Sequence, residues 1–287
     1  MQAIRSILVV IQPHLAENLA LKRAKLISGV TQSHLHLLVC EKAHDHQADL
    51  DTLAKSLTAE GFSVSTQQSW LNNMHETVIA AQQAEGCELV IKQHLPDNPL
   101  KKLVLTPSDW KLLRYSPVPV LMVKSAKAWT NGNVLAAVDA GNADGDHRAL
   151  HTSIISYAFD ITELAQGTLH VLSAHPSPML SAADPTFQLQ DTIAARYKAN
   201  CKSFMYELEL NPDCLHIEEG PADVLIPFTA KKLNAVLTVI GTVARKGLAG
   251  TLIGNTAEVI LDALDSDVLV LKPDDVLDHL ENLIAQH

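Results

Sequence analysis

The chain repeats itself, and this internal repeat limits its fold more than any other feature of the sequence. Apolar runs of the N-terminal half return in the C-terminal half in the same order. The matched runs are 6–12 with 133–139, 88–91 with 237–240, and 120–124 with 268–272. The spacing between matches grows along the chain, which indicates insertions in the early helices of the second half. We therefore expect two copies of one structural unit.

Each half alternates strand-like apolar runs with longer amphipathic segments. The runs are continuous in valine, isoleucine and leucine, which is typical of parallel strands buried on both faces by helices. We predict strands near 5–12, 34–40, 62–69, 88–92, 118–124, 132–139, 167–174, 214–219, 235–240 and 267–272. We predict helices near 17–28, 47–60, 73–85, 107–115, 146–165, 186–209, 221–232 and 255–264. The fold class is therefore α/β, with a five-stranded parallel sheet in each half.

The two units and their connection can be placed on the chain. We predict a first domain at 1–126 and a second at 131–275, joined by a linker within 124–132. The remaining residues, 276–287, form an acidic and weakly amphipathic C-terminal tail. Such a tail is expected to pack as a short helix or to fray.

Composition excludes several classes of protein. The chain has 287 residues, 47% of them hydrophobic, so two units of roughly 140 residues can each bury a core. Its net charge of −10 argues against nucleic acid or an anionic membrane as the main partner. No apolar run approaches the ~18–20 residues of a membrane span. The four cysteines have no paired metal or redox spacing and are expected to be reduced, which predicts a cytoplasmic protein.

A glycine-bearing loop near the C-terminus is the most specific local motif. It spans 241–256 and connects the strand-like run 234–240 to the helix-like run 256–264. Glycines let a backbone approach a ligand, and the free amides and dipole of a helix N-terminus attract phosphate. The loop therefore predicts a phosphate-binding site. It is not a Walker A loop, because no Gly-Lys-Ser/Thr follows its glycines.

Together these patterns resemble the universal stress protein family, and its tandem-domain type E members most closely. The resemblance covers nearly the whole chain. The family's phosphate loop runs Gly-x2-Gly-x9-Gly-Ser/Thr, and here it reads Gly241-x2-Ala244-x9-Gly254-Asn255, followed by Thr256. The other matching segments are Val138-Asp139 at the end of a first strand, 218–222 after a third strand, and 106–114 in the first half.

The resemblance implies a flavodoxin-like, or Rossmann-like, strand order in each of two tandem domains. Sheets of this kind bind ligands at the carboxyl ends of their strands, where the strand order reverses. The resemblance also implies that the halves pack as a pseudo-dimer, with the fifth strands meeting edge to edge. Segments 120–124 and 268–272 are the candidates, and their pairing would cover two exposed edges. A further homodimer is expected on the same ground.

An adenine nucleotide such as ATP is the cofactor that the resemblance implies for the second half. Asp139 would contact the adenosine or its ribose. Loop amides would wrap the phosphates, with side chains of Asn255 and Thr256 as further donors. The full set of expected nucleotide-binding residues is Val138, Asp139, Gly241, Ala244, Arg245, Gly254, Asn255 and Thr256.

A second interpretation of the loop needs no ligand. Asn255 can be the N-cap of the following helix, with Glu258 as its capping-box partner. Ala244 replaces a glycine of the family pattern, and its methyl group restricts positive φ. Glu258 also places a negative charge near the expected phosphates, which Arg245 and Lys246 would partly offset. Both interpretations stay open at this point.

The first half keeps the helix start but not the glycines. Segment 106–109, Thr-Pro-Ser-Asp, is a good helix N-terminus, with proline at the first helical position. Segment 92–94, Lys-Gln-His, and Leu105-Thr106 replace the glycines of the loop, while Gln12-Pro13 replaces the Val-Asp pair. Bulkier side chains would obstruct a close approach of backbone to phosphate. We predict that this half does not bind ATP.

Fourteen histidines raise the question of a metal. The densest cluster is 44–46, His-Asp-His, with Asp49 and Asp51 beyond it. His34 and His36 fall on one face of a predicted strand. Neither group supplies the closed set of ligands typical of a structural zinc site. We therefore expect solvated loop histidines and no metal.

No catalytic motif identifies an enzyme. The chain has neither a Gly-x-Ser-x-Gly elbow nor a His-Glu-x-x-His pair. His94 and Asp109 are interpreted as satisfied surface residues. The resemblance implies a non-enzymatic stress-response protein that binds an adenine nucleotide. Two alternatives remain: a weak ATPase or nucleotide-driven switch, and a protein that binds an apolar small molecule between its domains.

Overall fold

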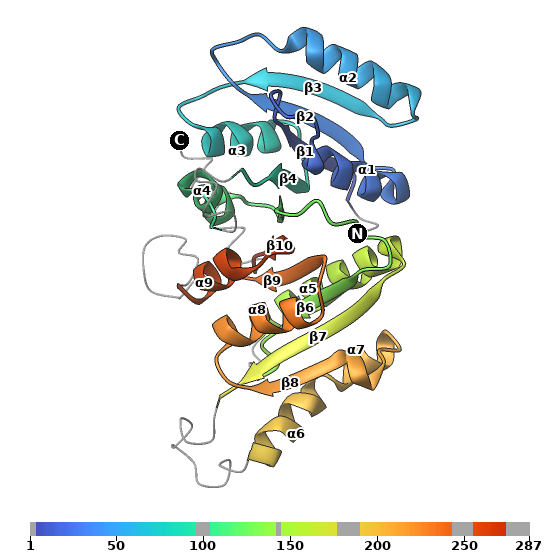
Figure 1. Ribbon diagram of the computed structural model, residues 1–287, viewed down its shortest axis with the longest axis vertical. Helices are drawn as coiled ribbons and strands as arrows, with labels where there is room; N and C mark the ends of the chain where they lie inside the picture. Colours follow the sequence, from blue (N-terminus) through green and yellow to red (C-terminus); the bar gives the residue numbers. More distant parts are fainter. Residues whose placement is uncertain (1–3, 96–103, 142–144, 177–189, 243–254, 274–287) are drawn as a thin grey trace.

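The computed structural model describes residues 4–95, 104–141, 145–176, 190–242 and 255–273. Within these ranges the strands form one ten-stranded sheet that runs through the long axis of the molecule (Figure 1). Strands are parallel within each half, and the two halves meet at a single antiparallel pair. The predicted α/β class, with two tandem flavodoxin-like units, is confirmed.

The elements of the first half agree with the sequence prediction within a few residues at each end. They are β1 (Ser6–Ile11), α1 (Leu19–Thr31), β2 (His34–Cys40), α2 (Gln47–Ala59), β3 (Val64–Ser69), α3 (Met74–Ala84), β4 (Leu89–Gln93), α4 (Pro107–Tyr115) and β5 (Val120–Val123). The buried valine, isoleucine and leucine runs supply the strands, because helices cover both faces of the sheet.

The second half contains the same elements with additions. They are β6 (Asn133–Ala137), α5 (Gly145–Ala165), β7 (Thr168–His175), α6 (Gln190–Asn200), α7 (Lys202–Glu207), the short 3₁₀ helix η4 (Pro212–Cys214), β8 (Leu215–Glu219), α8 (Ala222–Lys232), β9 (Leu237–Gly241), α9 (Asn255–Ala263) and β10 (Asp267–Leu271). Helix α5 has 21 residues where α1 has 13, so the predicted early insertion is present. The single helix predicted over 186–209 is wrong, because α6 and α7 are separate helices.

Strand order places a reversal point in each half. The order is β3-β2-β1-β4-β5-β10-β9-β6-β7-β8, so β1 lies beside β4 and β6 lies beside β9. At these two places the connections leave toward opposite edges of the sheet. At the second reversal point, Asp139 lies two residues after β6 and Gly241 is the last residue of β9, as the sequence predicts. The expected crevice is therefore located by the topology.

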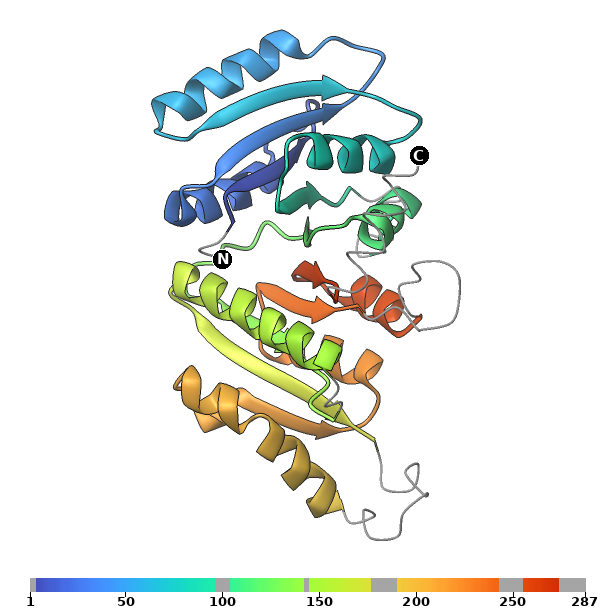
Figure 2. The same cartoon turned by 180° about the vertical axis from the view of Figure 1, so that it is seen from behind.

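Two hydrophobic cores lie on opposite faces of the sheet. Helices α1, α2 and α5 cover one face, which is seen in Figure 2, and α3, α4, α8 and α9 cover the other. Each core continues from one half into the other. The two halves are therefore joined by packed side chains as well as by strand pairing. None of the described helices is long and apolar enough to cross a bilayer.

The antiparallel pair β5–β10 joins the halves as predicted. Leu121 lies opposite Leu269 in the register, and both side chains are buried. This pairing removes the two strand edges that would otherwise be exposed in the middle of the molecule. The predicted domain limits at 126 and 131 stay predictions, and the tail 276–287 lies outside the described residues.

Two equivalent lysines hold the helices on either side of this seam. Lys124 Nζ donates to the carbonyl oxygens of Leu261 and Leu264, at 2.7 and 2.6 Å, at the end of α9. Lys272 Nζ donates to the carbonyl oxygen of Ser116, at the end of α4. Burial lowers the pKa of Lys124 to about 8 and that of Lys272 to about 7. Each half thus satisfies helix carbonyls of the other half.

A buried ion pair fastens the linker between the halves. Asp267, at the start of β10, accepts hydrogen bonds from Arg23 Nε at 2.7 Å and from Trp129 Nε1 at 2.9 Å. It also accepts the backbone N–H groups of Lys124 and Ser125, each at 2.9 Å. The Arg23 guanidinium lies 4.8 Å from the centre of the Trp129 ring. The predicted linker is therefore an ordered, partly buried segment.

Candidate functional site

The candidate site lies at the carboxyl ends of β6 and β9. Ala137 and Ile240 are the last paired residues of the two strands, and Val138 and Asp139 continue from β6. Val138 is buried, whereas the Asp139 side chain is exposed. The structure thus brings three of the predicted residues, Val138, Asp139 and Gly241, to one edge of the sheet.

Hydrogen bonds shape the turn that carries Asp139. Its backbone N–H donates to His151 Nε2 at 3.2 Å, which fixes the acceptor role of that ring nitrogen. Its Oδ1 accepts the backbone N–H of Gly141 at 3.2 Å, forming a tight Asx-type turn. His151 is a buried residue of α5, so the turn is anchored to that helix. Asp139 is therefore presented to solvent in a defined orientation.

Helix α6 and strand β7 form one wall beside this turn. The N–H of Ala140 donates to Ser173 Oγ at 3.1 Å, and Asn200 Nδ2 donates to the Ala140 carbonyl at 2.6 Å. A Cβ on Gly141 would lie 2.0 Å from the hydroxyl oxygen of Tyr197, so any larger residue there would force the Tyr197 ring to move. Burial, and to a lesser extent the charge of Asp139, raises the pKa of Tyr197.

Sequence reasoning missed Tyr197, His151 and Ser173 as parts of the site. Tyr197 lies between Ile193 and Cys201 at four-residue spacing, and this buried stripe packs on Ala140. The spacing alone indicates an apolar helix face, and it does not show which strand end that face covers. No pattern in the sequence distinguishes His151 from the other histidines.

Gly241 is required for packing rather than for a positive φ. It is the last residue of β9, opposite Leu271, and its φ is not positive. A Cβ at this position would lie 2.6 Å from Leu150 and 3.0 Å from Ile154, both on α5. Whether Gly241 also opens a phosphate-binding loop stays a prediction, because most of that loop lies outside the described residues. Its glycine identity is explained by the close approach of α5 to the strand.

The other predicted residues of the loop lie at the limit of what the structure describes. Ala244, Arg245 and Gly254 fall outside the described residues. Helix α9 begins at Asn255, with Thr256 in its first turn. The side chains of these two residues are also outside the description. Their proximity to Asp139 therefore stays a prediction.

Glu258 in the first turn of α9 pairs with the other half. Its Oε1 accepts a hydrogen bond from Nη2 of Arg114, on α4, at 2.9 Å. The side chains are 26% and 37% exposed for Arg114 and Glu258, so solvent screens the pair. The negative charge expected to oppose a phosphate is therefore balanced by a cation across the seam.

At the equivalent place in the first half, a buried carboxylate occupies the helix N-terminus. Asp109 accepts hydrogen bonds from Lys92 Nζ at 2.6 Å, from His94 Nδ1 at 2.8 Å and from the Thr106 N–H at 3.1 Å. Thr106 Oγ1 in turn accepts the Asp109 N–H, completing a capping box. Lys92 and His94 are each 5% exposed, and Asp109 is fully buried.

The electrostatics of this group favour an ionised carboxylate. Burial by itself would raise the pKa of Asp109, but hydrogen bonds from His94 and Lys92 and the lysine charge outweigh it and lower the pKa to about 2. The interpretation of His94 and Asp109 as surface residues is therefore wrong. The loss of the glycines suggests a degenerate surface turn, whereas this segment carries a buried ion pair.

The four cysteines, all of which lie among the described residues, form no disulfide. All four are free thiols, and three of them are buried. Burial raises the pKa of Cys40 to about 12 and that of Cys201 to about 11. Thiols with such values are poor nucleophiles near neutral pH. No cysteine chemistry is therefore expected at the site.

Comparison with known proteins finds relatives of the second half and of most of the chain. The sequence model of the universal stress protein family matches residues 130–272. Universal stress protein E of Escherichia coli K12 is 31% identical over 228 residues, which cover 77% of this chain and 72% of that protein. The universal stress protein E homologue of Haemophilus influenzae is 29% identical over 263 residues, covering 89% of this chain and 84% of that protein.

Solved structures extend the likeness to the whole chain. A candidate universal stress protein from Pseudomonas aeruginosa UCBPP-PA14 is 65% identical, with a TM-score of 0.91 and 99% of both chains covered. A universal stress protein from Archaeoglobus fulgidus is 16% identical, with a TM-score of 0.64 over 93% of this chain and 98% of that chain, and shares the fold. The chain therefore belongs to the universal stress protein family and resembles its type E members.

Proposed function

We propose that this chain is a non-enzymatic stress-response protein whose second half binds an adenine nucleotide, with ATP as the first candidate. The nucleoside would lie against Asp139 and the wall formed by Tyr197. The phosphates would lie at the N-terminus of α9, on the backbone of the loop that contains Ala244, Arg245 and Gly254. Asn255 and Thr256 would add side-chain donors there.

The observation that carries the proposal is the difference between two equivalent carboxylates. In the repeat, Asp109 corresponds to Glu258, since Thr106 corresponds to Asn255. Asp109 is buried at the N-terminus of α4, so the first half supplies an anion to its own helix. Glu258 contacts Arg114 of the other half instead. The positive end of α9 is therefore suited to an anion from solution, such as a phosphate.

Asp139 supports the nucleoside end of the same proposal. Its carboxylate is exposed at the strand reversal point and is oriented by the Gly141 N–H. An exposed carboxylate in this place is a hydrogen-bond acceptor for ribose hydroxyl groups. The first half has Gln12-Pro13 in place of the Val138-Asp139 pair, so it has no charged residue there. Both features thus favour one nucleotide site, in the second half.

ATP is expected to raise the melting temperature of the intact protein. At a concentration 100 times its Kd, a ligand stabilises the native state by about 2.7 kcal/mol. For a chain of this size we expect a rise in Tm of about 5 °C or more. Asp139→Ala should reduce the rise strongly, and Gly254→Val should do the same by crowding the backbone cradle. Scanning calorimetry with and without ATP measures both effects.

Gln12→Ala is the matched control in the first half, because the hydrogen bonds of Gln12 with Asn18 use its backbone groups. It should keep the full rise in Tm. No rise at millimolar ATP in the wild type would refute the proposal. Phosphate release that disappears in Asp139→Ala would show a weak ATPase instead of a binding protein.

A further inference from the structure

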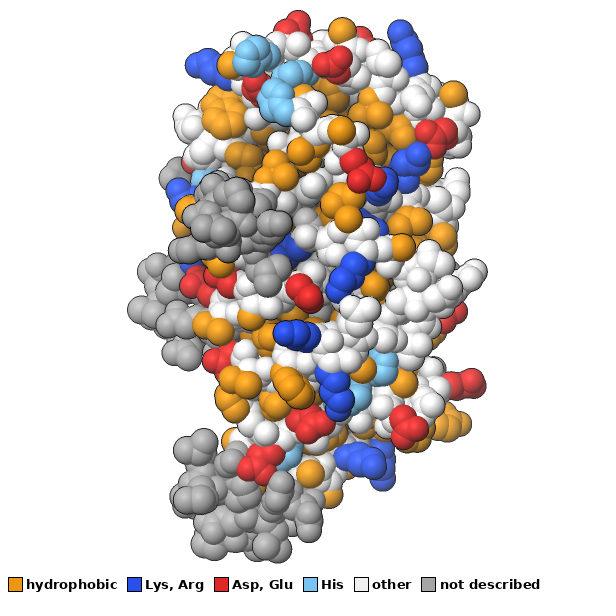
Figure 3. Space-filling model, in the orientation of Figure 1, with side chains coloured by type: hydrophobic (Ala, Val, Ile, Leu, Met, Phe, Trp, Pro, Cys, Tyr) orange, Lys and Arg blue, Asp and Glu red, His pale blue; other side chains and the backbone are white. Residues whose placement is uncertain are grey.

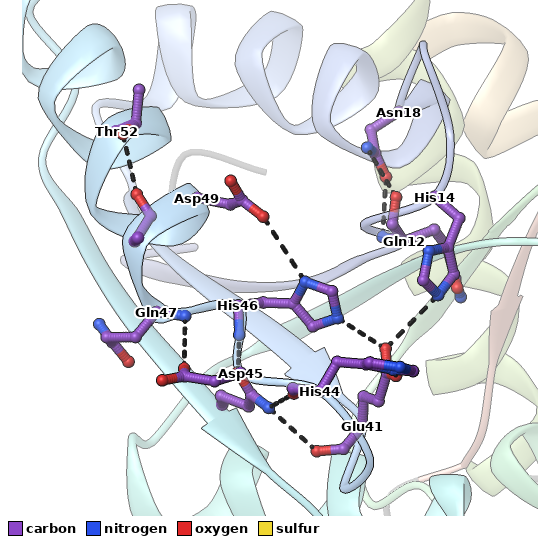
Figure 4. A network of polar contacts seen from close by, with 12 residues as sticks. Gln12, His14, Asn18, Glu41, His44, Asp45, His46, Gln47, Asp49 and Thr52 are labelled. Atoms are coloured by element: carbon purple, nitrogen blue, oxygen red, sulfur yellow. Dashed lines mark hydrogen bonds and ion pairs between the residues drawn. The ribbon is translucent and has the colours of Figure 1, made fainter.

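Three side chains with metal-binding atoms converge at the carboxyl edge of the first half. They are His14, in the loop after β1, Glu41, directly after β2, and His46, directly before α2 (Figure 4). Figure 3 shows histidine side chains gathered at this upper end of the molecule. The cluster lies in the half for which no nucleotide site is proposed. It is also distinct from the buried Lys92–Asp109 pair.

The donor atoms face one another. His46 Nε2 lies 2.8 Å and His14 Nε2 lies 3.5 Å from the same oxygen, Glu41 Oε2. One ligand atom from each of the three residues can be chosen so that all lie within 4.8 Å of one another. In a tetrahedral zinc site with bonds of ~2.0–2.1 Å, neighbouring ligand atoms are about 3.4 Å apart. Small side-chain rotations would bring the three atoms to that spacing.

We propose that His14, Glu41 and His46 form a binding site for a divalent transition-metal ion, with Zn²⁺ as the best match. Two imidazole nitrogens and one carboxylate oxygen are a ligand set that zinc accepts, with a fourth position left for water. The ion would replace the hydrogen bond that Glu41 now shares with His46. Both histidines would bind through Nε2.

Neighbouring groups hold these ligands in place. Gln68, on β3, accepts the His46 N–H at 2.6 Å and donates to the carbonyl oxygens of Glu41 and His44, at 3.3 and 2.6 Å. One side chain thus braces the whole loop between β2 and α2. Asp49 Oδ2 lies 3.6 Å from Nδ1 of His46, on the side away from Glu41. A carboxylate behind a ligating histidine is the common arrangement around protein-bound zinc.

The loop that carries His14 is braced in the same way. Asn18 Oδ1 accepts the Gln12 N–H at 2.9 Å, and Asn18 Nδ2 donates to the Gln12 carbonyl at 3.2 Å. The His14 side chain is 72% exposed, so it can turn toward an ion without disturbing the core. The open side of the cluster faces solvent, which gives an ion a path of entry.

Burial separates this cluster from an ordinary group of surface histidines. The sequence predicts solvated loop histidines, and His44 fits that prediction, but His46 is only 9% exposed. His34 and His36, by contrast, have serine partners, since both rings contact the hydroxyl of Ser65. That pair lies on one strand face, as predicted, and is part of the sheet's hydrogen bonding.

Titration of metal-free protein with Zn²⁺ tests the proposal. The intact chain, without a histidine tag and after treatment with EDTA, should bind one Zn²⁺ per cluster by calorimetry. Co²⁺ at the same site should give the visible absorption bands of a four-coordinate ion. His14→Asn and Glu41→Gln should each weaken binding by about tenfold or more. Since His14 is exposed, its substitution should leave the fold and the melting temperature intact.

His216→Asn is the control, because it removes a partly exposed histidine from the His170–His216 pair in the other half. It should leave the affinity of the cluster unchanged. Binding that is equally strong in the wild type and in both cluster variants would overturn the proposal. So would the absence of saturable Zn²⁺ binding in the wild type. Binding of ATP, measured in the same samples, should not depend on these substitutions.

Discussion

Asp267→Ala is expected to lower the free energy of unfolding by about 3–5 kcal/mol. The substitution leaves the buried guanidinium of Arg23 without its carboxylate and removes the acceptor for the Trp129 N–H. It also releases the two backbone N–H groups at the end of β5. Because these groups come from α1, the linker and β10, one substitution loosens the junction of the two halves. Urea unfolding followed by circular dichroism measures the loss.

Asp265→Ala provides the matched control two residues away. Its carboxylate is 46% exposed and lies 3.9 Å from Lys127, so the pair is a screened surface contact. We expect a loss of no more than about 0.5 kcal/mol for this variant. A similar small loss for Asp267→Ala would show that the buried ion pair does not hold the halves together.

Asp109→Asn is expected to cost about 2–3 kcal/mol at neutral pH, because it leaves the buried Lys92 ammonium without a counter-ion. The pKa of Asp109 is lowered from 3.8 to about 2 in the folded protein. Its contribution is therefore fully present above the unfolded pKa and is lost as the pH falls from about 4 toward 2. The gap between wild type and variant should narrow by about 1 kcal/mol between pH 7 and pH 3. Urea unfolding at the two pH values measures it.

The equivalent carboxylate of the second half gives an internal comparison. Glu258→Gln removes only a half-exposed pair with Arg114 and should cost less than about 1 kcal/mol at either pH. Equal losses for Asp109→Asn and Glu258→Gln would contradict the asymmetry between the two helix N-termini on which the proposed function rests.

The fold could be predicted closely because its signals are local and repeated. Continuous apolar runs such as Ile7–Ile11 are buried on both faces, and a run of this kind is typical of a strand in a parallel sheet covered by helices. The repeat then indicates that two such sheets are present, and the pairing of Leu121 with Leu269 confirms how they meet. The division between α6 and α7 was not predicted, because the amphipathic pattern continues across Cys201.

The site was harder to predict because it depends on contacts between distant segments. Asp139 could be placed from its position after a strand. The sequence places Gly241 at the start of a phosphate loop, but it does not show that a Cβ at this position would also meet Leu150 and Ile154 of α5. Tyr197 reaches the site through the packing of α6, which no spacing in the sequence encodes.

Charge pairing was the least visible property in the sequence. In the sequence, Lys92 looks like a substitution that degrades a loop and Asp109 like part of a helix start, and only the fold shows that the two form a buried ion pair at that helix N-terminus. His46 likewise looks solvated in the sequence, but the structure shows that its loop is held against β3 by a hydrogen bond from the His46 N–H to Gln68. In both cases the two partners lie more than ten residues apart in the sequence. Only the folded structure shows that these residues are buried and paired.

The central claim is that one half of this tandem protein accepts a nucleotide while the other half is filled by its own side chains. Calorimetric titration of the intact, metal-free protein with ATP measures the number of sites directly. We expect one ATP per chain, with binding strongly weakened by Asp139→Ala and unaffected by Gln12→Ala. Two sites per chain, or no saturable binding at millimolar ATP, would contradict the account.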